Sequence, residues 1–475
     1  MRRPNILILY TDQQRWDAVG VNGNPEIQTP NLDRLAAQGT NFDHYFVQNP
    51  VCMPSRISFL TGQYPSTLGI THMGVPVPEE TQTLPHLLRP YGYRTANIGK
   101  LHFLPHANRD HRVPHPDYGF DHLEISDEPG VYEDAYRAWV RQQAPEQLDH
   151  LSVGLPPSTA VWYETMRIQD PVAHPSRGGR SDFKGVIPFP GDERYTHSAF
   201  VAEQTMEFLQ QQDGTQPFLC IAGFYSPHAP WVVPQRFLDL YDPDALTLPT
   251  FPPEIEAQRS NSTFSDAQLR SARHGYYAMV TEVDHHVGRI LEKLEERGLA
   301  ENTIIVFTSD HGEWLGEHLR YGKGYPGSDA VSRVPLIVRT PGQAATGQTV
   351  NTIVEGVDVV PTILEAVAIQ LPPHLQGQSL LPFMAGNNTD NNVDDGVGAY
   401  AIMEHAGWKT LRTARYRYLI HADGSELLWD LATDPQGYHN VADEPTSQPI
   451  LAEHRRLLLQ HIVTSERPRS RIWTY

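Results

Sequence analysis

Cysteine is scarce in this sequence, which contains only Cys52 and Cys220. So few cysteines exclude the disulfide framework that stabilises many small secreted domains. Cys220 lies in the apolar run 218–222, which is typical of a buried strand, so we predict an inert core residue there. Cys52 stands just before Pro54 at a predicted helix start instead, and this different setting makes it a candidate functional residue.

Basic residues and long apolar runs are also in short supply. The 37 Lys and Arg residues are outnumbered by 56 Asp and Glu residues, which gives a formal net charge of −19. This balance argues against nucleic acid as a partner, because binding it requires a basic face. No stretch has the apolar length of a membrane span. The first residues lead directly into a predicted strand without a signal peptide, so we expect a cytoplasmic protein with no membrane partner.

Predicted strands and helices alternate along the chain. Asn5 to Tyr10 is a continuous apolar run, as expected for a strand buried on both faces of a parallel sheet. Similar runs predict three further strands, at residues 94–98, 217–224 and 303–308. Capping residues and glycines predict one helix from Pro30 to Gly39 and a long one from Ser265 to Gly298. The alternation predicts an α/β fold with a large, mostly parallel central sheet and helices on both faces.

Two domains are expected. The first, residues 1–384, is the main α/β domain, with rim insertions at about 105–200 where the sequence is rich in Pro and His. An Asn- and Asp-rich linker follows, from Ala385 to Gly396. Residues 397–475 then predict a small α+β subdomain, because four β-type runs separated by turns indicate an antiparallel sheet at 400–403, 409–413, 416–420 and 426–429.

Two pairs of polar residues directly follow predicted strands. Asp12-Gln13 follows the first strand and Asp310-His311 follows the strand at 303–308, so both pairs lie at carboxyl ends, where open α/β sheets place their sites. A lone Asp after a strand is more often a helix N-cap than a ligand, by about 3:1. Two such pairs, together with Cys52, reverse that preference. Carboxylates, an amide oxygen and an imidazole are suitable ligands for a divalent cation. Ca²⁺ is the first choice, and Mg²⁺ and Mn²⁺ are the alternatives.

Cys52 occupies a predicted helix start. Pro54 suits the first turn of a helix that continues through Ile57 and Leu60, so Cys52 lies at its N-terminus. Free backbone N–H groups and the positive end of the helix dipole stabilise negative charge at such a position. The helix start is therefore a suitable place for a nucleophile that reacts with an anion.

The run Cys52-Met53-Pro54-Ser55-Arg56, followed by Leu60-Thr61-Gly62, resembles the maturation signature of the type I sulfatases of the alkaline phosphatase superfamily. The resemblance implies that a maturation enzyme oxidises Cys52 to formylglycine, the nucleophile of these hydrolases. It also implies that a divalent metal is held by Asp12, Gln13, residue 52, Asp310 and His311. The expected activity is release of inorganic sulfate from an organic sulfate ester.

Three further segments match this family in the same order along the chain. Gly99-Lys100-Leu101-His102 resembles its Gly-Lys-x-His motif, whose Lys and His lie beside formylglycine. The Pro-His pair at His228 resembles the segment that carries the leaving-group histidine, and Lys323 matches a lysine that binds a sulfate oxygen. Arg56 is expected to hold the formylglycine alkoxide. With 23 histidines in the chain, the joint occurrence of these segments carries the argument, not any single residue.

Two other functions remain open from the sequence. Gln13 and His311 stand where many sulfatases have Asp and Asn or Gln, and this set is also similar to choline sulfatases and to phosphonate monoester hydrolases. A phosphonate or phosphate ester hydrolase is therefore the alternative, although Lys100 and His102 favour a sulfatase. A binding protein on a decayed hydrolase scaffold is disfavoured, because every chemical residue is present. Choline sulfate, aryl sulfates and sulfated sugars all remain possible substrates, with glycans slightly favoured by the long polar rim.

Overall fold

The computed structural model describes residues 3–105, 114–129, 133–151, 153, 185–259, 264–343, 346–385 and 400–465. Most of the predicted linker and the Gly- and Arg-rich run at 176–180 lie outside these residues. Within the described part, no helix is both long and apolar enough to cross a membrane. The division into domains at 384 and 397 stays a prediction.

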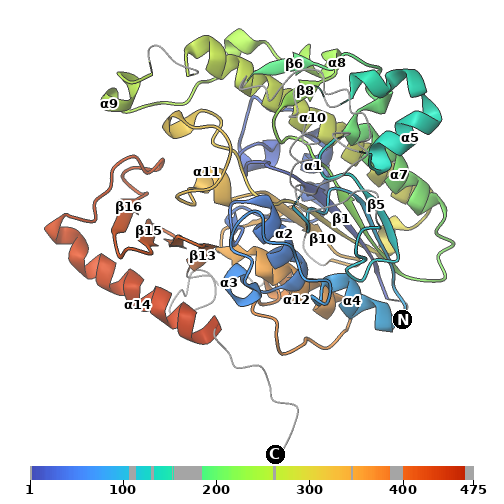
Figure 1. Ribbon diagram of the computed structural model, residues 1–475. Helices are drawn as coiled ribbons and strands as arrows, with labels where there is room; N and C mark the ends of the chain where they lie inside the picture. Colours follow the sequence, from blue (N-terminus) through green and yellow to red (C-terminus); the bar gives the residue numbers. More distant parts are fainter. Residues whose placement is uncertain are drawn as a thin grey trace, which may run out of the picture.

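A mixed, mostly parallel sheet forms the centre of the molecule (Figure 1). In spatial order its eight strands are β11 (Gln348–Val350), β2 (Thr40–Phe42), β10 (Leu336–Arg339), β9 (Thr303–Ser309), β1 (Asn5–Thr11), β7 (Phe218–Gly223), β4 (Arg94–Gly99) and β5 (His122–Ile125). Within this sheet β10 runs antiparallel to both of its neighbours. The α/β prediction is confirmed, and each predicted central strand appears within one residue of its expected bounds.

Each face of the sheet is covered by helices because alternate residues of the buried strands point to opposite sides. Ile6, Ile8 and Tyr10 of β1 pack with one group of helices: α2 (Cys52–Thr61), α4 (Leu84–Leu88) and α12 (Val359–Ala366). Leu7 and Leu9 pack on the other side, with α1 (Pro30–Gln38), α5 (Ala135–Gln143), α7 (His197–Gln210) and α10 (Asp266–Glu296). The two hydrophobic cores hold β1 rigidly, and β1 ends at the residues of the predicted site.

The C-terminal part forms the predicted antiparallel sheet. Its strands are β13 (Tyr400–His405), β14 (Trp408–Thr413), β15 (Tyr416–His421) and β16 (Glu426–Asp430). One face packs against α14 (Gln448–Ser465) through Leu411, Tyr418 and Leu458, and the other face joins Phe46 of the main body in a small core. Figure 1 shows this sheet and α14 beside the central sheet. The sheet is therefore packed between its own helix and the main body.

The remaining elements are short and lie around these layers. Two pairs of short parallel strands are β3 (Tyr45–Phe46) with β12 (Val354–Glu355), and β6 (Val186–Pro188) with β8 (Trp231–Val233). Single-turn helices are α3 (Pro65–Leu68), α8 (Gln235–Leu238), α9 (Pro253–Glu256), α11 (Asp329–Ser332) and α13 (Leu381–Met384).

Residues 105–200, which we expected to be rim insertions, contribute elements to the main body where the structure describes them. β5 lies within this stretch and extends the central sheet by pairing with β4, while α5 and the start of α7 cover one face. β5 is short and only its last residue, Ile125, is buried, as expected for an edge strand. A four-residue strand with His122 and Glu124 at alternate positions lacks the continuous apolar pattern that identified the central strands.

Candidate active site

Asp12 and Asp310 meet because their strands are parallel neighbours. β1 and β9 pair in register with Thr11 opposite Ser309, so the next residue of each strand emerges at the same sheet edge. The Gln13 backbone N–H donates to Asp310 Oδ1 at 3.1 Å, which joins the two strand ends directly. Both aspartates are fully buried. The predicted convergence of the two polar pairs is therefore present in the structure.

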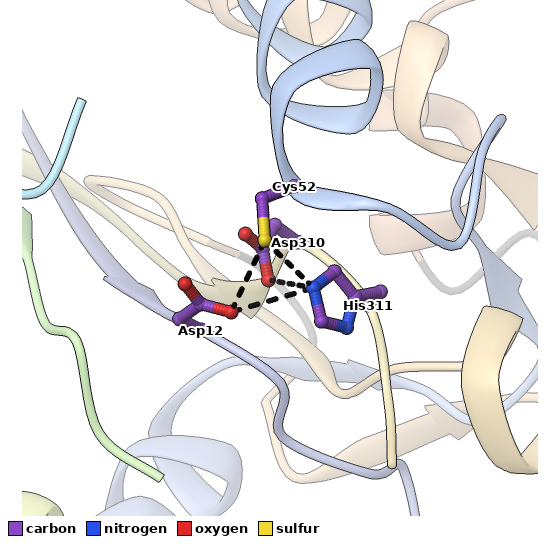
Figure 2. Close-up of side chains that lie close together, drawn as sticks. All are labelled: Asp12, Cys52, Asp310 and His311. Atoms are coloured by element: carbon purple, nitrogen blue, oxygen red, sulfur yellow. Dashed lines mark hydrogen bonds and ion pairs between the residues drawn. The ribbon is translucent and has the colours of Figure 1, made fainter. Parts of the chain in front are cut away.

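Cys52 reaches these carboxylates from the first position of α2. The helix is fixed over the sheet edge by Ser55, whose hydroxyl donates to the Asp310 carbonyl at 2.5 Å. Cys52 Sγ lies 3.1 Å from His311 Nε2 and 3.8 Å from Asp12 Oδ1. Figure 2 shows the four side chains pointing toward one another. Their possible ligand atoms all lie within 4.8 Å of one another, and all four residues are buried.

The donor set of this cluster fits a divalent cation. His311 Nδ1 lies 2.9 Å from the Gly312 carbonyl, so it donates its proton there and leaves the Nε2 lone pair facing the carboxylates. Gln13 Oε1 is buried and has no hydrogen-bond partner among the described residues. Two carboxylates and an imidazole nitrogen therefore lie together with residue 52, and the carboxylate oxygens suit a divalent cation.

Three cationic side chains surround the two carboxylates. Arg56 Nε donates to Asp310 Oδ2 at 2.7 Å, and Lys100 Nζ lies 2.5 Å from Asp12 Oδ2. Lys323 Nζ donates to Cys52 Sγ at 2.5 Å. Burial alone would raise the pKa of Asp12, but Lys100 above all, together with nearby histidine and lysine side chains, holds that pKa well below its usual value. The cluster can therefore attract an anion despite the negative charge of the whole protein.

Cys52 itself is poorly suited to act as an unmodified nucleophile. Burial, followed by the charge of Asp12, raises the pKa of its thiol to about 11. A thiol with such a pKa stays protonated near neutral pH, and the thiolate is the reactive form of cysteine. Arg56, which we expected to hold the nucleophile's alkoxide, directs its hydrogen bonds to Asp310 and to the Lys100 carbonyl.

His228 and Lys323 are less buried than the rest of the site and form its more open side. His228 Nδ1 lies 2.6 Å from the Ala229 carbonyl, and its Nε2 lies 3.1 Å from Lys323 Nζ. Nδ1 therefore donates and Nε2 accepts, which fixes one neutral tautomer. Burial, and then the charge of Lys323, lower the pKa of His228 to about 3. The proton at this side of the site thus resides on Lys323.

The predicted Gly-Lys-x-His segment leaves β4 and turns sharply. His102 has a left-handed backbone conformation, with φ of 57°, and its N–H donates to Asp127 Oδ1 at 2.8 Å. The same oxygen accepts the Leu101 N–H, also at 2.8 Å. Lys100 Nζ lies 4.9 Å from the centre of the Tyr225 ring, which gives the buried ammonium a second favourable contact.

Sequence reasoning missed three residues of this site: Asp127, Tyr225 and Glu313. Asp127 and Tyr225 support Lys100 and its neighbours from distant segments, so no local pattern indicated them. Glu313 accepts hydrogen bonds from Gln13 and from the Lys323 loop, and its place three residues after Asp310 is the only signal that could have identified it.

Comparison with known proteins identifies the fold. It is that of the hydrolases of the alkaline phosphatase superfamily. Within it, residues 4–369 match the Sulfatase family, and residues 316–464 match the family described as N-sulphoglucosamine sulphohydrolase, C-terminal. The chain therefore belongs to the sulfatase family, and the resemblance inferred from the sequence is confirmed.

Three similar proteins illustrate the range of this family. An arylsulfatase of Clostridium perfringens is 28% identical over 483 residues, covering 97% of this chain and 94% of the relative. An ulvan-active sulfatase of Formosa agariphila is 28% identical over 461 residues, covering 95% of this chain and 79% of the relative. The crystal structure of a phosphonate monoester hydrolase of Agrobacterium radiobacter superposes with a TM-score of 0.80 at 25% identity, covering 98% of this chain and 96% of that one.

Proposed function

We propose that this sulfatase-family hydrolase releases inorganic sulfate from an organic sulfate ester, using residue 52 after its conversion to formylglycine. The observation that carries the proposal is the position of Cys52, at the positive end of α2 and in contact with His311 and Lys323. A hydrated aldehyde would supply two geminal hydroxyls there, one to attack sulfur and one to expel sulfate. A thiol or a serine hydroxyl lacks the second of these functions.

A divalent cation, with Ca²⁺ as the first choice, would be held by Asp12, Gln13, residue 52, Asp310 and His311. When bound, it would polarise the sulfuryl oxygens and lower the pKa of the hydroxyl at residue 52. The possible ligand atoms of Asp12, Cys52, Asp310 and His311, which lie within 4.8 Å of one another, support this assignment. Gln13 Oε1 supports it too, because it is buried without a hydrogen-bond partner among the described residues.

The remaining side chains would stabilise charge and transfer protons. Lys100 and Lys323 would hold the sulfuryl oxygens as charge develops on them. His228, whose Nε2 lies 3.1 Å from Lys323 Nζ, would deliver a proton to the departing alcohol as general acid. His102 would take the proton from the second hydroxyl as sulfate leaves. Arg56 would fix Asp310 and the start of α2.

Conversion of Cys52 can be tested directly by mass spectrometry. The peptide that carries residue 52 should be lighter by about 18 Da than the cysteine form when the protein is co-expressed with a formylglycine-generating enzyme. Sulfate release should then rise in proportion to the converted fraction. Full activity in a preparation whose residue 52 is entirely cysteine would contradict the proposal.

Phosphonate monoester hydrolysis is the second candidate, favoured by the Asp-Gln and Asp-His pairs and by the likeness to the Agrobacterium radiobacter enzyme. Lys100 and His102 of the Gly-Lys-x-His segment favour a sulfate ester. We expect kcat/KM for 4-nitrophenyl sulfate to exceed that for 4-nitrophenyl phenylphosphonate by at least tenfold, which corresponds to about 1.4 kcal/mol of transition-state discrimination. A reversed ratio, measured on one converted preparation, would make the phosphonate ester the better substrate class.

The alcohol part of the substrate is proposed only as a class. A sulfated glycan is supported by the named activity of the ulvan-active relative. A panel of sulfated monosaccharides, choline sulfate and an aryl sulfate, assayed for sulfate release, would rank the three candidates.

A further inference from the structure

Glu313 is a buried carboxylate that lies between a proposed metal ligand and the loop of Lys323. Its exposed fraction is 1%, and it follows Asp310 and His311 by only a few residues. Oε2 accepts a hydrogen bond from Gln13 Nε2. Oε1 accepts the Leu315 N–H at 3.0 Å and the Gly322 N–H at 2.5 Å. The two oxygens of one carboxylate therefore hold two different segments.

The contact through Oε2 determines how the Gln13 side chain is oriented. Only the amide nitrogen of Gln13 can donate to a carboxylate, so the nitrogen must face Glu313 and the amide oxygen must face away from it. That oxygen, Gln13 Oε1, is buried without a hydrogen-bond partner among the described residues. Leaving it unpaired has a free-energy cost, which a cation at the adjacent cluster would remove.

The contact through Oε1 restrains the residue before Lys323. Gly322 is held on both sides, because its N–H donates to Glu313 and its carbonyl accepts the Trp314 N–H at 2.9 Å. Lys323 follows directly, and its Nζ donates to Cys52 Sγ. Because the backbone is fixed at residue 322, Lys323 loses less conformational entropy when it binds a sulfuryl oxygen.

We propose that Glu313 is the positioning residue of this site, which turns the Gln13 oxygen toward the divalent cation and fixes the backbone that carries Lys323. This inference rests on the proposed function for the presence of the cation. Glu313 is not among the residues whose possible ligand atoms lie together at the site. It acts through Gln13 and through Gly322.

The substitution Glu313→Gln tests the first of these roles with little change of shape. Its amide oxygen can keep the bonds from Leu315 and Gly322, while its NH₂ group replaces Oε2 and faces the NH₂ group of Gln13. Two donors then oppose each other, so the Gln13 amide loses its orientation. We expect the affinity for Ca²⁺ or Mn²⁺, measured by calorimetric titration of the metal-free protein, to fall by about 10- to 100-fold.

The double substitution Gln13→Glu with Glu313→Gln restores the hydrogen bond between positions 13 and 313, with the donor and the acceptor exchanged. The new amide at position 313 would donate to one oxygen of the new carboxylate at position 13, and the other oxygen of that carboxylate would face the cation. Gln13→Glu alone places two carboxylates against each other. We therefore expect both single variants to bind the ion more weakly than the wild type, and the double variant to recover to within about threefold of it.

This four-protein comparison separates orientation from simple charge. If only charge mattered, Gln13→Glu would tighten binding, Glu313→Gln would weaken it, and the two changes in log affinity would add. Glu317→Gln is the matched control, because it removes a carboxylate from the same loop whose partner is Arg15, and its ion affinity should stay within about threefold of the wild type. Wild-type affinity in Glu313→Gln, or strict additivity, would overturn the inference.

Kinetics at saturating ion separate the two roles. Because Glu313→Gln keeps the acceptor for the Gly322 N–H, its kcat should return to within about threefold of the wild type once the metal site is filled. A kcat that stays more than about tenfold low at saturating ion would contradict the division of labour between the two oxygens. Failure of the wild-type protein to bind either ion would instead refute the metal site of the proposed function.

Discussion

The Cys52→Ser protein is expected to release at most one equivalent of alcohol per active site and then to stop. A serine hydroxyl at the start of α2 can still attack sulfur, because Lys323 and the helix N-terminus remain in place. The product would be a serine sulfate ester with no second hydroxyl on the same carbon to expel the sulfate. A burst of 4-nitrophenol without a steady state, together with a gain of one sulfate in the protein mass, would be the measurement.

Cys52→Ala should remove even this single event and lower kcat/KM by about 10⁴-fold or more, the scale expected when the nucleophile of a covalent mechanism is deleted. Cys220→Ala is the matched control, because Cys220 is buried in β7 within the hydrophobic core. It should lose stability but keep its kcat. Continuous turnover by Cys52→Ser would show that residue 52 does not need two hydroxyl groups, and the proposed chemistry would be wrong.

The strand ends of the site could be predicted because the relevant information is local. Asp12 and Asp310 each follow a short, continuously apolar run, and such runs become buried parallel strands with a common carboxyl edge. Pro54 likewise predicts the start of α2. These patterns are sufficient to place two carboxylates and Cys52 at one edge, and the structure confirms that they lie together.

Features that depend on contacts between distant segments could not be predicted. β5 joins the sheet only through its pairing with β4, and its sequence of alternating polar residues resembles a loop. The orientation of the Gln13 amide is set by a residue 300 positions away. The hydrogen bond between Lys323 and His228 likewise joins residues 95 positions apart, and it changes which group holds the proton. Sequence spacing contains no information on such geometry.

The contact between Lys323 and His228 leads to the second prediction with a large expected effect on activity. His228→Ala should lower kcat/KM for an alkyl or sugar sulfate by about 10²- to 10⁴-fold, the usual contribution of a positioned proton donor. An alkoxide is a poor leaving group and needs the proton as the ester bond breaks. 4-Nitrophenolate is stable without a proton, so the same variant should lose less than about tenfold on 4-nitrophenyl sulfate.

A series of aryl sulfates with increasing leaving-group pKa would measure this difference. We expect log kcat/KM to fall more steeply with leaving-group pKa in His228→Ala than in the wild type, because the variant no longer neutralises the developing charge. His197→Gln is the control, since this buried histidine also packs against Tyr225 but directs its ring nitrogen to the Ser126 carbonyl. Its effect should be the same for every substrate in the series. Equal slopes for His228→Ala and the wild type would show that His228 does not transfer the proton. Lys323, which already holds the proton in the structure, would then be the donor.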